Sequence, residues 1–353
     1  IAQCIAKTAS RWRRKAWVVL SLCIDLGLLG YFKYFNFLRE IMAAVAHELG
    51  YQLGNTSLQN IPYQPLDIFL PVGISFFTFQ TISYVIDVYR GRIAPLRRWI
   101  DYVFYVSFFP QLVAGPIVRA RDFIPQIYKT PVVTRVEFGE GLFLVLCGLF
   151  KKTVISDYIS LNFVDRIFDA PLLYTGVENL LGVYGYALQI YCDFSGYSDM
   201  AIGIALLLGF RFNMNFDSPY QSATITEFWR RWHISLGTWF REYVYIPLGG
   251  NRKGIVRQIV NLAIVWFLTG LWHGAYINFV LWGVYYGILL VIEKFLLKNV
   301  LKALPAILQH FYTMLLVMVG WSLFSWQDMA DAAGYIKTMF FCGGAGYIND
   351  QTF

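Results

Sequence analysis

Long runs of apolar residues, separated by shorter polar stretches, dominate this chain. The runs cover residues 16–38, 66–89, 138–163, 177–210, 258–275, 277–292 and 305–326. They approach or exceed the roughly 20 residues that a helix needs to cross a bilayer. The pattern predicts an all-α polytopic membrane protein. Because no soluble stretch of useful size separates the runs, residues 1–353 are expected to form a single membrane-embedded domain.

Two segments between these runs differ from the rest. Residues 40–65 contain no lysine or arginine but hold two glycines and two prolines, which favours an external loop with a short helix over 40–49. The stretch FFPQLVAGPIVR at 108–119 is apolar but broken by Pro110, Gly115 and Pro116. Broken backbone at membrane depth is tolerated only where protein or a cavity covers it, so a re-entrant segment is expected there.

Composition excludes the ordinary soluble classes. Hydrophobic residues make up 57% of the chain, charged residues 14%, and the mean hydropathy is +0.50, whereas charged residues reach about a quarter in soluble domains. The cysteines, Cys4, Cys23, Cys147, Cys192 and Cys342, lie far apart without a C-x-x-C pair. They are interpreted as packing residues rather than as a disulfide framework or a metal site.

The formal charge of +7 raises the question of a nucleic-acid partner. We assume that residues 1–15 are cytoplasmic and that residues 100–118 enter and leave the membrane on the same side. The alternating crossings then assign every loop to one side of the membrane. The inner loops are then 1–15, 90–98, 119–135, 211–257 and 294–302, and they hold 23 of the 29 Lys and Arg residues. This asymmetry follows the positive-inside rule. The charge therefore predicts the lipid bilayer as a partner and no nucleic acid.

The stretch FWRRWHISLGTWF at 228–240 places His233 among arginines and large aromatics. Thr224 and Glu227 precede it at capping-box spacing, which predicts the start of a helix. In one continuous helix the apolar face would hold Phe228, Trp232, Leu236, Trp239 and Tyr243, with Arg230 and Arg241 on the polar side and His233 at the boundary. Such a helix lies at the cytoplasmic interface or tilts into the bundle. The alternative to a functional histidine is an interfacial anchor helix.

The second histidine of interest, His273, lies in WFLTGLWHGAYINFVLWG at 266–283. Trp266, Thr269 and Gly270 precede it by seven, four and three residues, on the same side of a helix. This small, polar stripe is expected to face the bundle interior or a water-filled cavity. An ionisable side chain there indicates function because isolated polar groups are costly in hydrocarbon, and imidazole suits proton transfer near neutral pH. A histidine that only hydrogen-bonds between helices is the alternative.

A further polar stripe runs through LQIYCDFSGYSDM at 188–200, where Gln189, Asp193 and Gly196 follow at helical spacing. An aspartate at the centre of a membrane helix costs about 2.5–3.5 kcal/mol, so a partner such as Arg, His or a hydroxyl is expected for Asp193. A structural bridge is favoured over direct chemistry. Phosphate-binding glycine loops, zinc-protease motifs and Cys/His clusters do not occur in the sequence, so no metal site is expected.

Four stretches together resemble the membrane-bound O-acyltransferases (MBOAT). They are FFPQLVAGPIVR, LQIYCDFSGYSDMAIGIALLLGFRFNMNF, FWRRWHISLGTWFREYVYIPLGGNRKG and GLWHGA. The resemblance is to the bacterial branch concerned with alginate O-acetylation and, at greater distance, to the branch of teichoic-acid D-alanylation. It runs from about residue 17 to about residue 340. Compared with the family pattern, the chain is expected to lack the first membrane segments and the C-terminal end.

The resemblance implies a curved helical bundle around a trans-bilayer tunnel, with re-entrant and interfacial helices, in the bacterial inner membrane. His273 matches the family's invariant histidine and His233 its second polar site, so both are predicted as catalytic. Family members take an acyl group from a cytoplasmic thioester, so acetyl-CoA or another acyl thioester is the expected donor, without a permanently bound cofactor. They deliver it to a hydroxyl, often of a polysaccharide outside the cell, and an extracytoplasmic esterase-like transferase is the expected partner.

Further residues are predicted to bind substrate around the two histidines. They are Arg230, Arg231, Arg241, Trp232, Trp272, Asn278 and Asp193. The arginines, together with Arg252 and Lys253, are expected to contact donor phosphates because guanidinium groups match phosphate oxygens. Retention of the loop in the cytoplasm is the competing explanation for most of these charges.

For the mechanism, His273 is predicted to act as general base on an acceptor hydroxyl as that hydroxyl attacks the thioester carbonyl. His233, or a neighbour on its helix, is predicted to orient the donor or to stabilise charge at the tunnel mouth. Three alternatives stay open on sequence alone: a multi-span transporter or flippase of a lipid-linked sugar, D-alanyl transfer to teichoic acid, and a non-catalytic scaffold of an acylation complex.

Overall fold

The computed structural model describes residues 1–54 and 64–341, and every regular element in these residues is a helix. The predicted all-α class is therefore confirmed. In the described residues, four helical stretches are long and apolar enough to cross a membrane: Arg11–Leu53, Ile255–His273, Ile277–Ala303 and Ala306–Ser325. They overlap the segments predicted at 16–38, 258–275, 277–292 and 305–326, but the first and third extend well beyond the predicted ends.

The other three predicted segments are also helical. Helix α5, Ile74–Tyr89, covers most of 66–89, and α11, Gly176–Leu207, covers nearly all of 177–210. Residues 138–163 lie in a continuous helical stretch that runs from α8, Arg135–Leu149, through the π-helical segments η3, Phe150–Ser156, and η4, Ser160–Val164. That these segments cross a bilayer stays a prediction.

The loop predicted from residue 40 begins later than expected. Helix α3 runs over Phe35–Leu53 rather than over 40–49, because it continues α2 through the π-helical turn η1. It ends at Gly54, whose φ of +65° lies in the left-handed region that glycine reaches without steric cost. The remainder of the predicted loop, 55–63, and Cys342 lie outside the described residues.

The chain divides into two compact units. The helices of the first unit are α1 (Ala2–Lys7), α2 (Arg11–Leu29), η1 (Gly30–Tyr34), α3, α5 and α6 (Trp99–Ser107). Polar groups connect these helices: the guanidinium of Arg14 donates to the carbonyl of Tyr89 at 2.8 Å, and the ammonium of Lys33 donates to the hydroxyl of Ser75 at 3.0 Å. Helix α5 is buried along most of its length.

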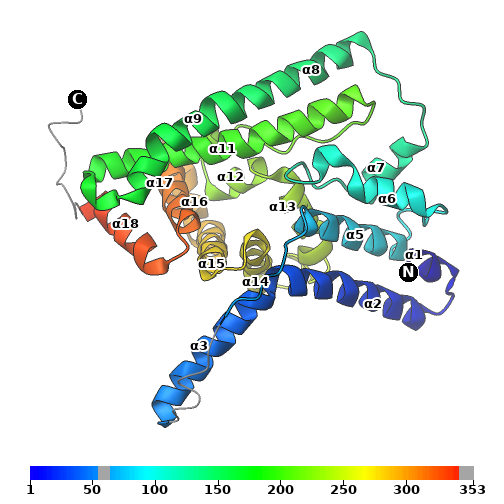
Figure 1. Cartoon of the computed structure of the whole chain (residues 1–353), viewed down its shortest axis with the longest axis horizontal. Coiled ribbons are helices and arrows are strands. Elements are labelled where there is room, and N and C mark those ends of the chain that lie inside the picture. The colour runs from blue at the N-terminus through cyan, green and yellow to red at the C-terminus, as the bar shows by residue number, and fades with distance from the viewer. Residues whose placement is uncertain (55–63, 342–353) are drawn as a thin grey trace. The chain divides into compact units, whose positions relative to one another are not determined.

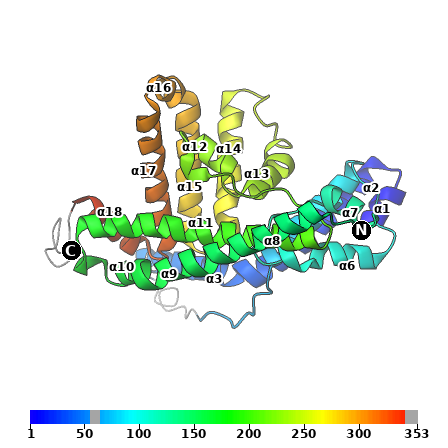
Figure 2. The same cartoon turned by 90° about the horizontal axis from the view of Figure 1, so that it is seen from above.

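The second unit contains the remaining helices, which are η2 (Phe109–Gln111), most of α7 (Ala120–Ile127), α8, η3, α9 (Asp157–Ile159), η4, α10 (Asp165–Asp169), η5 (Pro171–Leu173), α11, η6 (Pro219–Gln221), α12 (Ile225–Arg231), α13 (Ile234–Phe240), η7 (Arg241–Tyr245), α14 (Ile255–His273), α15 (Ile277–Ile292), η8 (Glu293–Leu297), α16 (Lys298–Ala303), α17 (Ala306–Ser325) and α18 (Met329–Phe341). Within it, α14, α15 and α17 stand next to one another, and the pair α8 and α11 runs across them (Figure 2).

Helices α8 and α11 lie side by side because glycines allow their backbones to touch (Figure 1). A methyl group on Gly148 of α8 would lie 2.4 Å from the carbonyl oxygen of Gly196 on α11, and one on Gly203 of α11 would lie 2.5 Å from the carbonyl oxygen of Gly141. The polar stripe predicted through Gly196 therefore lies on the face of α11 that packs on α8 and η3, and Gly203 continues that face.

The segment at 108–119 is irregular, as its prolines and glycine predicted. After the short 3-10 turn η2 it continues without regular structure to Arg119. Ser235 on α13 accepts a hydrogen bond from the backbone N–H of Ile117 at 3.0 Å, and Pro110 and Gln111 are buried. Other parts of the unit therefore cover this backbone, as irregular structure in a membrane requires. Its re-entrant path in the bilayer stays a prediction.

A large aromatic cluster forms the core of the second unit. Trp282, Tyr286 and Trp321 are fully buried, and Phe228 and Trp232 pack on them from the α12 segment. Trp282 meets Tyr286 edge to face and stacks with Trp321, and aromatic quadrupoles favour both edge-to-face and offset-stacked arrangements. This cluster joins α12 to α15 and α17.

The contact between α14 and α15 provides a test of this packing. A methyl group on Gly270 would lie 2.2 Å from the carbonyl oxygen of Phe279, which is backbone and cannot move aside without separating the helices. We expect Gly270→Ala to destabilise the protein by about 1–3 kcal/mol, the usual cost of overpacking. The measurement is thermal unfolding in detergent.

Gly139→Ala in α8 is the matched control, because a methyl group there meets nothing within 4 Å. It should be neutral or stabilising by up to about 1 kcal/mol, since alanine favours a helix over glycine. Equal melting temperatures for the two variants would contradict the close contact of α14 with α15.

Candidate functional site

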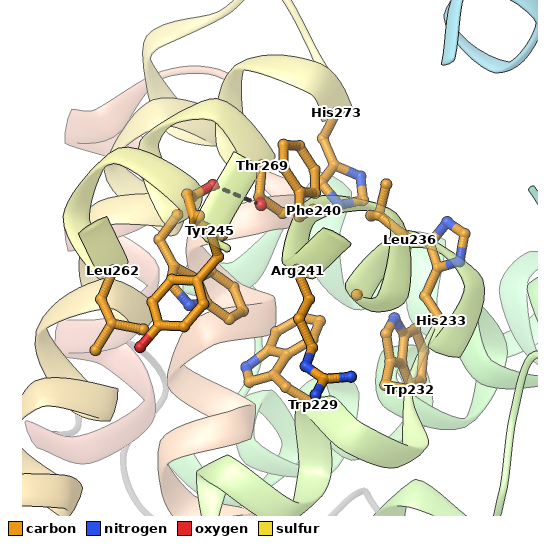
Figure 3. Close-up of a pocket in the computed structure, with 13 residues that line it drawn as sticks. Trp229, Trp232, His233, Leu236, Phe240, Arg241, Tyr245, Leu262, Thr269 and His273 are labelled. Atoms are coloured by element: carbon orange, nitrogen blue, oxygen red, sulfur yellow. Dashed lines mark hydrogen bonds between the residues drawn. The ribbon is translucent and has the colours of Figure 1, made fainter. Parts of the chain in front are cut away.

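A cavity of about 220 Å³ lies in the second unit between α12, α13, η7 and α14. His233 and His273 both line it, together with Thr269 and Arg241 (Figure 3). Most of the remaining wall is aromatic or aliphatic. The two histidines, which are 40 positions apart in the sequence, thus share one mainly apolar space, called the histidine cavity below.

Helix α12 starts where the sequence predicted. The side-chain oxygen of Thr224 accepts a hydrogen bond from the backbone N–H of Glu227 at 3.0 Å. The carboxylate of Glu227 accepts from the N–H of Ala223 rather than from that of Thr224. A second carboxylate, that of Glu293, accepts from the N–H groups of Ile225 and Thr226 at 2.7 and 2.9 Å. The first turn of α12 is therefore fixed to the end of α15.

The continuous helix predicted across 228–243 is wrong. Helix α12 ends at Arg231, and α13 begins at Ile234. Between them His233 has φ +48° and ψ 54°, a left-handed conformation that costs a non-glycine residue about 1–3 kcal/mol. The sequence has no proline or glycine at 231–234. Hydrophobic periodicity therefore gave no signal for a break, and it predicted that the helix continues.

Neighbouring backbone at 215–217 explains the break. The N–H of Asp217 donates to the carbonyl of Arg231 at 2.9 Å, and the N–H of Ile234 donates to the carbonyl of Asn215 at 2.9 Å. These bonds satisfy groups at the end of α12 and the start of α13 that a continuous helix would pair internally. Tertiary hydrogen bonding thus replaces local helical bonding.

The break changes the position of His233. The residues of the predicted apolar face are all buried, as expected: Phe228, Trp232, Leu236, Trp239 and Tyr243. His233 was predicted at the margin of that face, but it is only 2% exposed. Its ring meets that of Phe194 edge to face at 4.7 Å. The turn in the backbone directs the imidazole into the protein.

Hydrogen bonds define the protonation of His233. The N–H of Ser235 donates to Oδ1 of Asn215 at 3.2 Å and its hydroxyl donates to the same oxygen at 2.9 Å, so the amide oxygen of Asn215 faces His233. Because Nδ1 of His233 lies 3.2 Å from that oxygen, Nδ1 carries the proton. Nε2 is then the basic nitrogen, and no described residue is hydrogen-bonded to it.

The electrostatic surroundings keep His233 neutral. Burial lowers the pKa of His233 well below its usual value, and the nearby imidazole of His273 lowers it further. A neutral ring with Nδ1–H can only accept a hydrogen bond at Nε2. His233 is therefore suited to orient a donor group rather than to stabilise negative charge.

His273 is the last residue of α14 and is half-buried. Its ring centroid lies 4.9 Å from that of Trp282 and 5.5 Å from that of Phe324, both edge to face. Trp272 contacts the rings of both histidines, at 5.0 Å from His273 and 5.8 Å from His233. An aromatic frame thus holds the imidazole at one end of the histidine cavity.

The stripe predicted beside His273 is partly right. Trp266 and Thr269 line the histidine cavity as expected. The hydroxyl of Thr269 donates to the carbonyl of Val265 at 2.8 Å (Figure 3), which leaves its oxygen lone pairs available. Gly270 faces α15 instead, because the two helices make their closest contact there.

The predicted substrate-binding residues divide into two groups. Trp232 and Arg241 line the histidine cavity, and Trp272 lies between its two histidines. Arg231 forms an ion pair with Glu227 at 2.8 Å, and Arg230 lines a different cavity. The described lining of the histidine cavity includes neither Arg230 nor Arg231.

Other predicted residues lie away from the histidine cavity. Asn278 is buried and donates from Nδ2 to the carbonyl of Phe324 at 3.2 Å, which joins α15 to α17. Arg252 and Lys253 lie exposed in the turn before α14. These positions favour a structural role for Asn278.

The polar stripe of α11 also has a structural explanation. Asp193 forms an ion pair with Lys152 at 2.6 Å, and Asp199 forms one with Lys151 at 2.6 Å. The expected partner of Asp193 therefore exists, but it is a lysine, and the aspartate is half-exposed rather than buried. The bridges connect α11 to η3, which agrees with the favoured interpretation as a structural bridge.

Sequence reasoning missed Asn215, Ser235 and Glu293, which fix His233 and the helix before it. Asn215 lies outside any helix, so hydrophobic periodicity carries no signal for it. The only available signal was its place in GFRFNMNF, part of a stretch that resembles the acyltransferases.

Comparison with known proteins identifies a family for this chain. The sequence model of the membrane-bound O-acyltransferase family matches residues 98–328, which include both histidines. The chain is 42% identical to the probable alginate O-acetylase of Pseudomonas putida over 327 residues, which are 93% of this chain and 65% of that protein.

Two further relatives carry different names. A peptidoglycan O-acetyltransferase of Helicobacter pylori is 35% identical over 369 residues, covering 96% of this chain and 67% of that protein. A teichoic acid D-alanyltransferase of Bacillus subtilis is 29% identical over 252 residues, covering 67% of this chain and 62% of that protein.

The chain spans 65% of the length of the Pseudomonas putida relative, whereas the family match extends over most of this chain. The matched region contains the whole of α8 to α17, and thus the histidine cavity and its framework. The all-helical fold and the apolar helices agree with a membrane protein of this kind. The chain belongs to the membrane-bound O-acyltransferase family.

Proposed function

We propose that this protein transfers an acyl group, in particular acetyl, from a cytoplasmic thioester towards a hydroxyl acceptor at the outer face of a bacterial inner membrane. The observation that carries the proposal is the histidine cavity, where His233 and His273 meet in one space. The end product is an O-acetylated extracellular or cell-wall polysaccharide. The names of the Pseudomonas and Helicobacter relatives support acetyl as the group and polysaccharide as the target.

The shape of the cavity supports transfer between two sites. Its lining extends along α14 from Leu262 to His273, a distance of roughly 16 Å at the rise of an α-helix. A donor that enters near Leu262 brings its thioester close to His273. The proposal places the acceptor at the other side of His273, so that the cavity forms the donor half of a tunnel across the bilayer.

In the proposed reaction His273 is the general base. Its imidazole takes the proton of the acceptor hydroxyl while the hydroxyl oxygen attacks the thioester carbonyl carbon. The carbon–sulfur bond breaks, and the thiolate leaves with the proton that His273 returns. The products are an ester and a free thiol, so neither an oxidant nor a resident cofactor is required.

His233 has a positioning role in this scheme. Its Nε2 accepts a hydrogen bond from the donor, for example from an amide N–H of a pantetheine arm. Its Nδ1–H is held by Asn215. Arg241 lines the same cavity and adds positive charge to it. An extracytoplasmic esterase-like transferase completes the transfer to the polymer.

His273→Ala tests the general base. Loss of a general base removes about 10²- to 10⁴-fold in rate, so we expect transfer from radiolabelled acetyl-CoA to fall at least about a hundredfold in purified, folded protein. His310→Ala is the matched control, since His310 is exposed at the start of α17 and lines neither the histidine cavity nor the cavity that contains Arg230.

Wild-type turnover in His273→Ala would remove this residue from the mechanism. If the protein transfers D-alanine from a carrier-protein thioester and does not use acetyl-CoA, the acyl group of the proposed reaction is D-alanyl rather than acetyl. Movement of a lipid-linked sugar without acyl transfer would favour the flippase. Modification in cells that persists without either histidine would favour the scaffold.

Asn215 offers a separate test of how His233 is held. Asn215→Ala removes the acceptor of the Nδ1–H bond and leaves the ring free to change tautomer. We expect turnover to fall about 10- to 100-fold, as for the partners that orient metal-bound histidines, because Asn215 likewise fixes the tautomer and the orientation of the ring.

Asn215→Asp keeps an acceptor and adds negative charge beside Nδ1–H, which raises the pKa of His233. Neutral His233 then needs a higher pH, so the acid limb of the pH–rate profile should shift upwards while turnover at alkaline pH recovers. An unshifted acid limb, with equal losses in both variants, would show that Asn215 serves folding alone.

A further inference from the structure

Exposed positive charge on the first unit is confined to two segments. Every exposed lysine and arginine among the described residues of that unit falls within 7–15 or 90–98. Neither segment contains an aspartate or a glutamate. Six of these exposed cations are Lys7, Arg11, Arg13, Lys15, Arg90 and Arg97.

Hydrogen bonds hold the two segments together at one end of the unit. The side-chain amide of Gln3 in α1 donates to the carbonyl of Leu96 at 3.0 Å. The guanidinium of Arg14 in α2 donates to the carbonyl of Tyr89 at the end of α5 at 2.8 Å. Figure 1 shows α1 and the start of α2 beside the end of α5. The cations of both segments therefore belong to one surface.

The nearest carboxylates in the chain do not reach this surface. Asp87 and Asp101 are buried, and each is already held by an arginine: Asp87 by Arg92 at 3.2 Å and Asp101 by Arg98 at 2.7 Å. Exposed charge at this end of the unit is thus positive only. Like charges that gather on one surface raise the local potential and attract anions.

Two exposed tryptophans stand among these cations. The structure describes all 11 tryptophans of the chain, and only Trp12 and Trp99 are exposed, at 76% and 75%. In the sequence Trp12 stands between Arg11 and Arg13, and Trp99 follows Arg98. An indole suits the surface of a bilayer because its ring is apolar and its N–H stays hydrated. The six cations and the two tryptophans are called the Trp–Arg patch below.

The Trp–Arg patch lies where an apolar helix begins. The helical stretch Arg11–Leu53 is long and apolar enough to cross a membrane, and residues 16–24 of it carry no charge. Its first turn therefore belongs at the membrane surface. The positive-inside rule explains the cations there, but it does not require exposed indoles. Clusters of four to eight cations beside a membrane helix attract anionic headgroups.

We propose that the Trp–Arg patch binds the phosphate headgroups of anionic phospholipids such as phosphatidylglycerol. The cations contact the phosphates, and the two indoles enter the boundary between headgroups and acyl chains. The patch thereby holds this end of the first unit at the membrane surface. The inference goes beyond the proposed acyl transfer and does not depend on it, because the histidine cavity belongs to the second unit.

Quenching of tryptophan fluorescence by brominated lipids tests the proposal. Purified protein is placed in phosphatidylcholine nanodiscs that contain a minor share of brominated phosphatidylglycerol, or the same share of brominated phosphatidylcholine. The quenching that is lost in Trp12→Phe/Trp99→Phe comes from the patch. We expect that part to report phosphatidylglycerol enriched at least about fivefold over phosphatidylcholine, the factor that one cation near an anionic surface supplies.

Two charge variants and a matched control identify the cations responsible. Arg11→Gln/Arg13→Gln should reduce the enrichment at least about fivefold, and Lys7→Gln/Lys15→Gln, at other positions of the patch, should lower it in the same way. Arg252→Gln/Lys253→Gln is the control, because it removes two charges from an exposed turn that has no exposed tryptophan beside it. It should leave the enrichment at the wild-type value.

Three results would overturn the proposal. Equal quenching by the two brominated lipids in wild type would show no preference for the anionic headgroup. Equal loss of enrichment in the control would show that overall charge, rather than the Trp–Arg patch, attracts the lipid. Absence of quenching by either lipid would place the indoles away from the bilayer and favour a soluble acidic protein as the partner.

A parallel assay of acetyl transfer separates this inference from the proposed function. Acetyl transfer by wild-type protein without enrichment of phosphatidylglycerol would keep the enzyme and reject the Trp–Arg patch. Enrichment that depends on Arg11 and Arg13, in a protein without acyl transfer, would support the patch and reject the enzyme.

Discussion

The backbone hydrogen bonds between residues 215–217 and the turn at His233 are the constraint on which the histidine cavity depends. They pair the ends of α12 and α13 at the point where a helix would otherwise continue. The left-handed turn costs energy, yet it directs His233 inward, where it lines the histidine cavity together with Leu236. Without this break, His233 would lie at the margin of an interfacial helix and the two histidines would not share a space.

The aromatic core and the glycine contacts hold the two histidine-bearing segments in place. Phe228 and Trp232 pack on Trp321, and Trp229 packs on Trp282, so the segment that carries His233 is fixed to α15 and α17. The close approach of α14 and α15 at Gly270 fixes the helix that carries His273 to the same core. Each histidine is therefore held by a different helix pair, and one aromatic cluster joins the two pairs.

Charge in this protein follows two separate rules. Along α8, η3 and α11, cations are neutralised by ion pairs such as Lys151 with Asp199, which stabilise helix packing. In the cavity that contains Arg230, the lining cations Arg230, Lys294, Lys298 and Lys302 form no ion pair with a described carboxylate. A count of lysines and arginines in loops treats both groups alike, and only their positions in space distinguish them.

The sequence by itself determined the helical class, the four helical stretches that are long and apolar enough to cross a membrane, the cap at Thr224 and the burial of the aromatic face, because these depend on local periodicity and side-chain chemistry. It also singled out the two histidines. The tertiary structure alone decided the break at His233, the tautomer set by Asn215, the side of α14 taken by Gly270 and the convergence of cations near Arg230. These features depend on hydrogen bonds and contacts between residues far apart in the chain, which periodicity within one segment does not record.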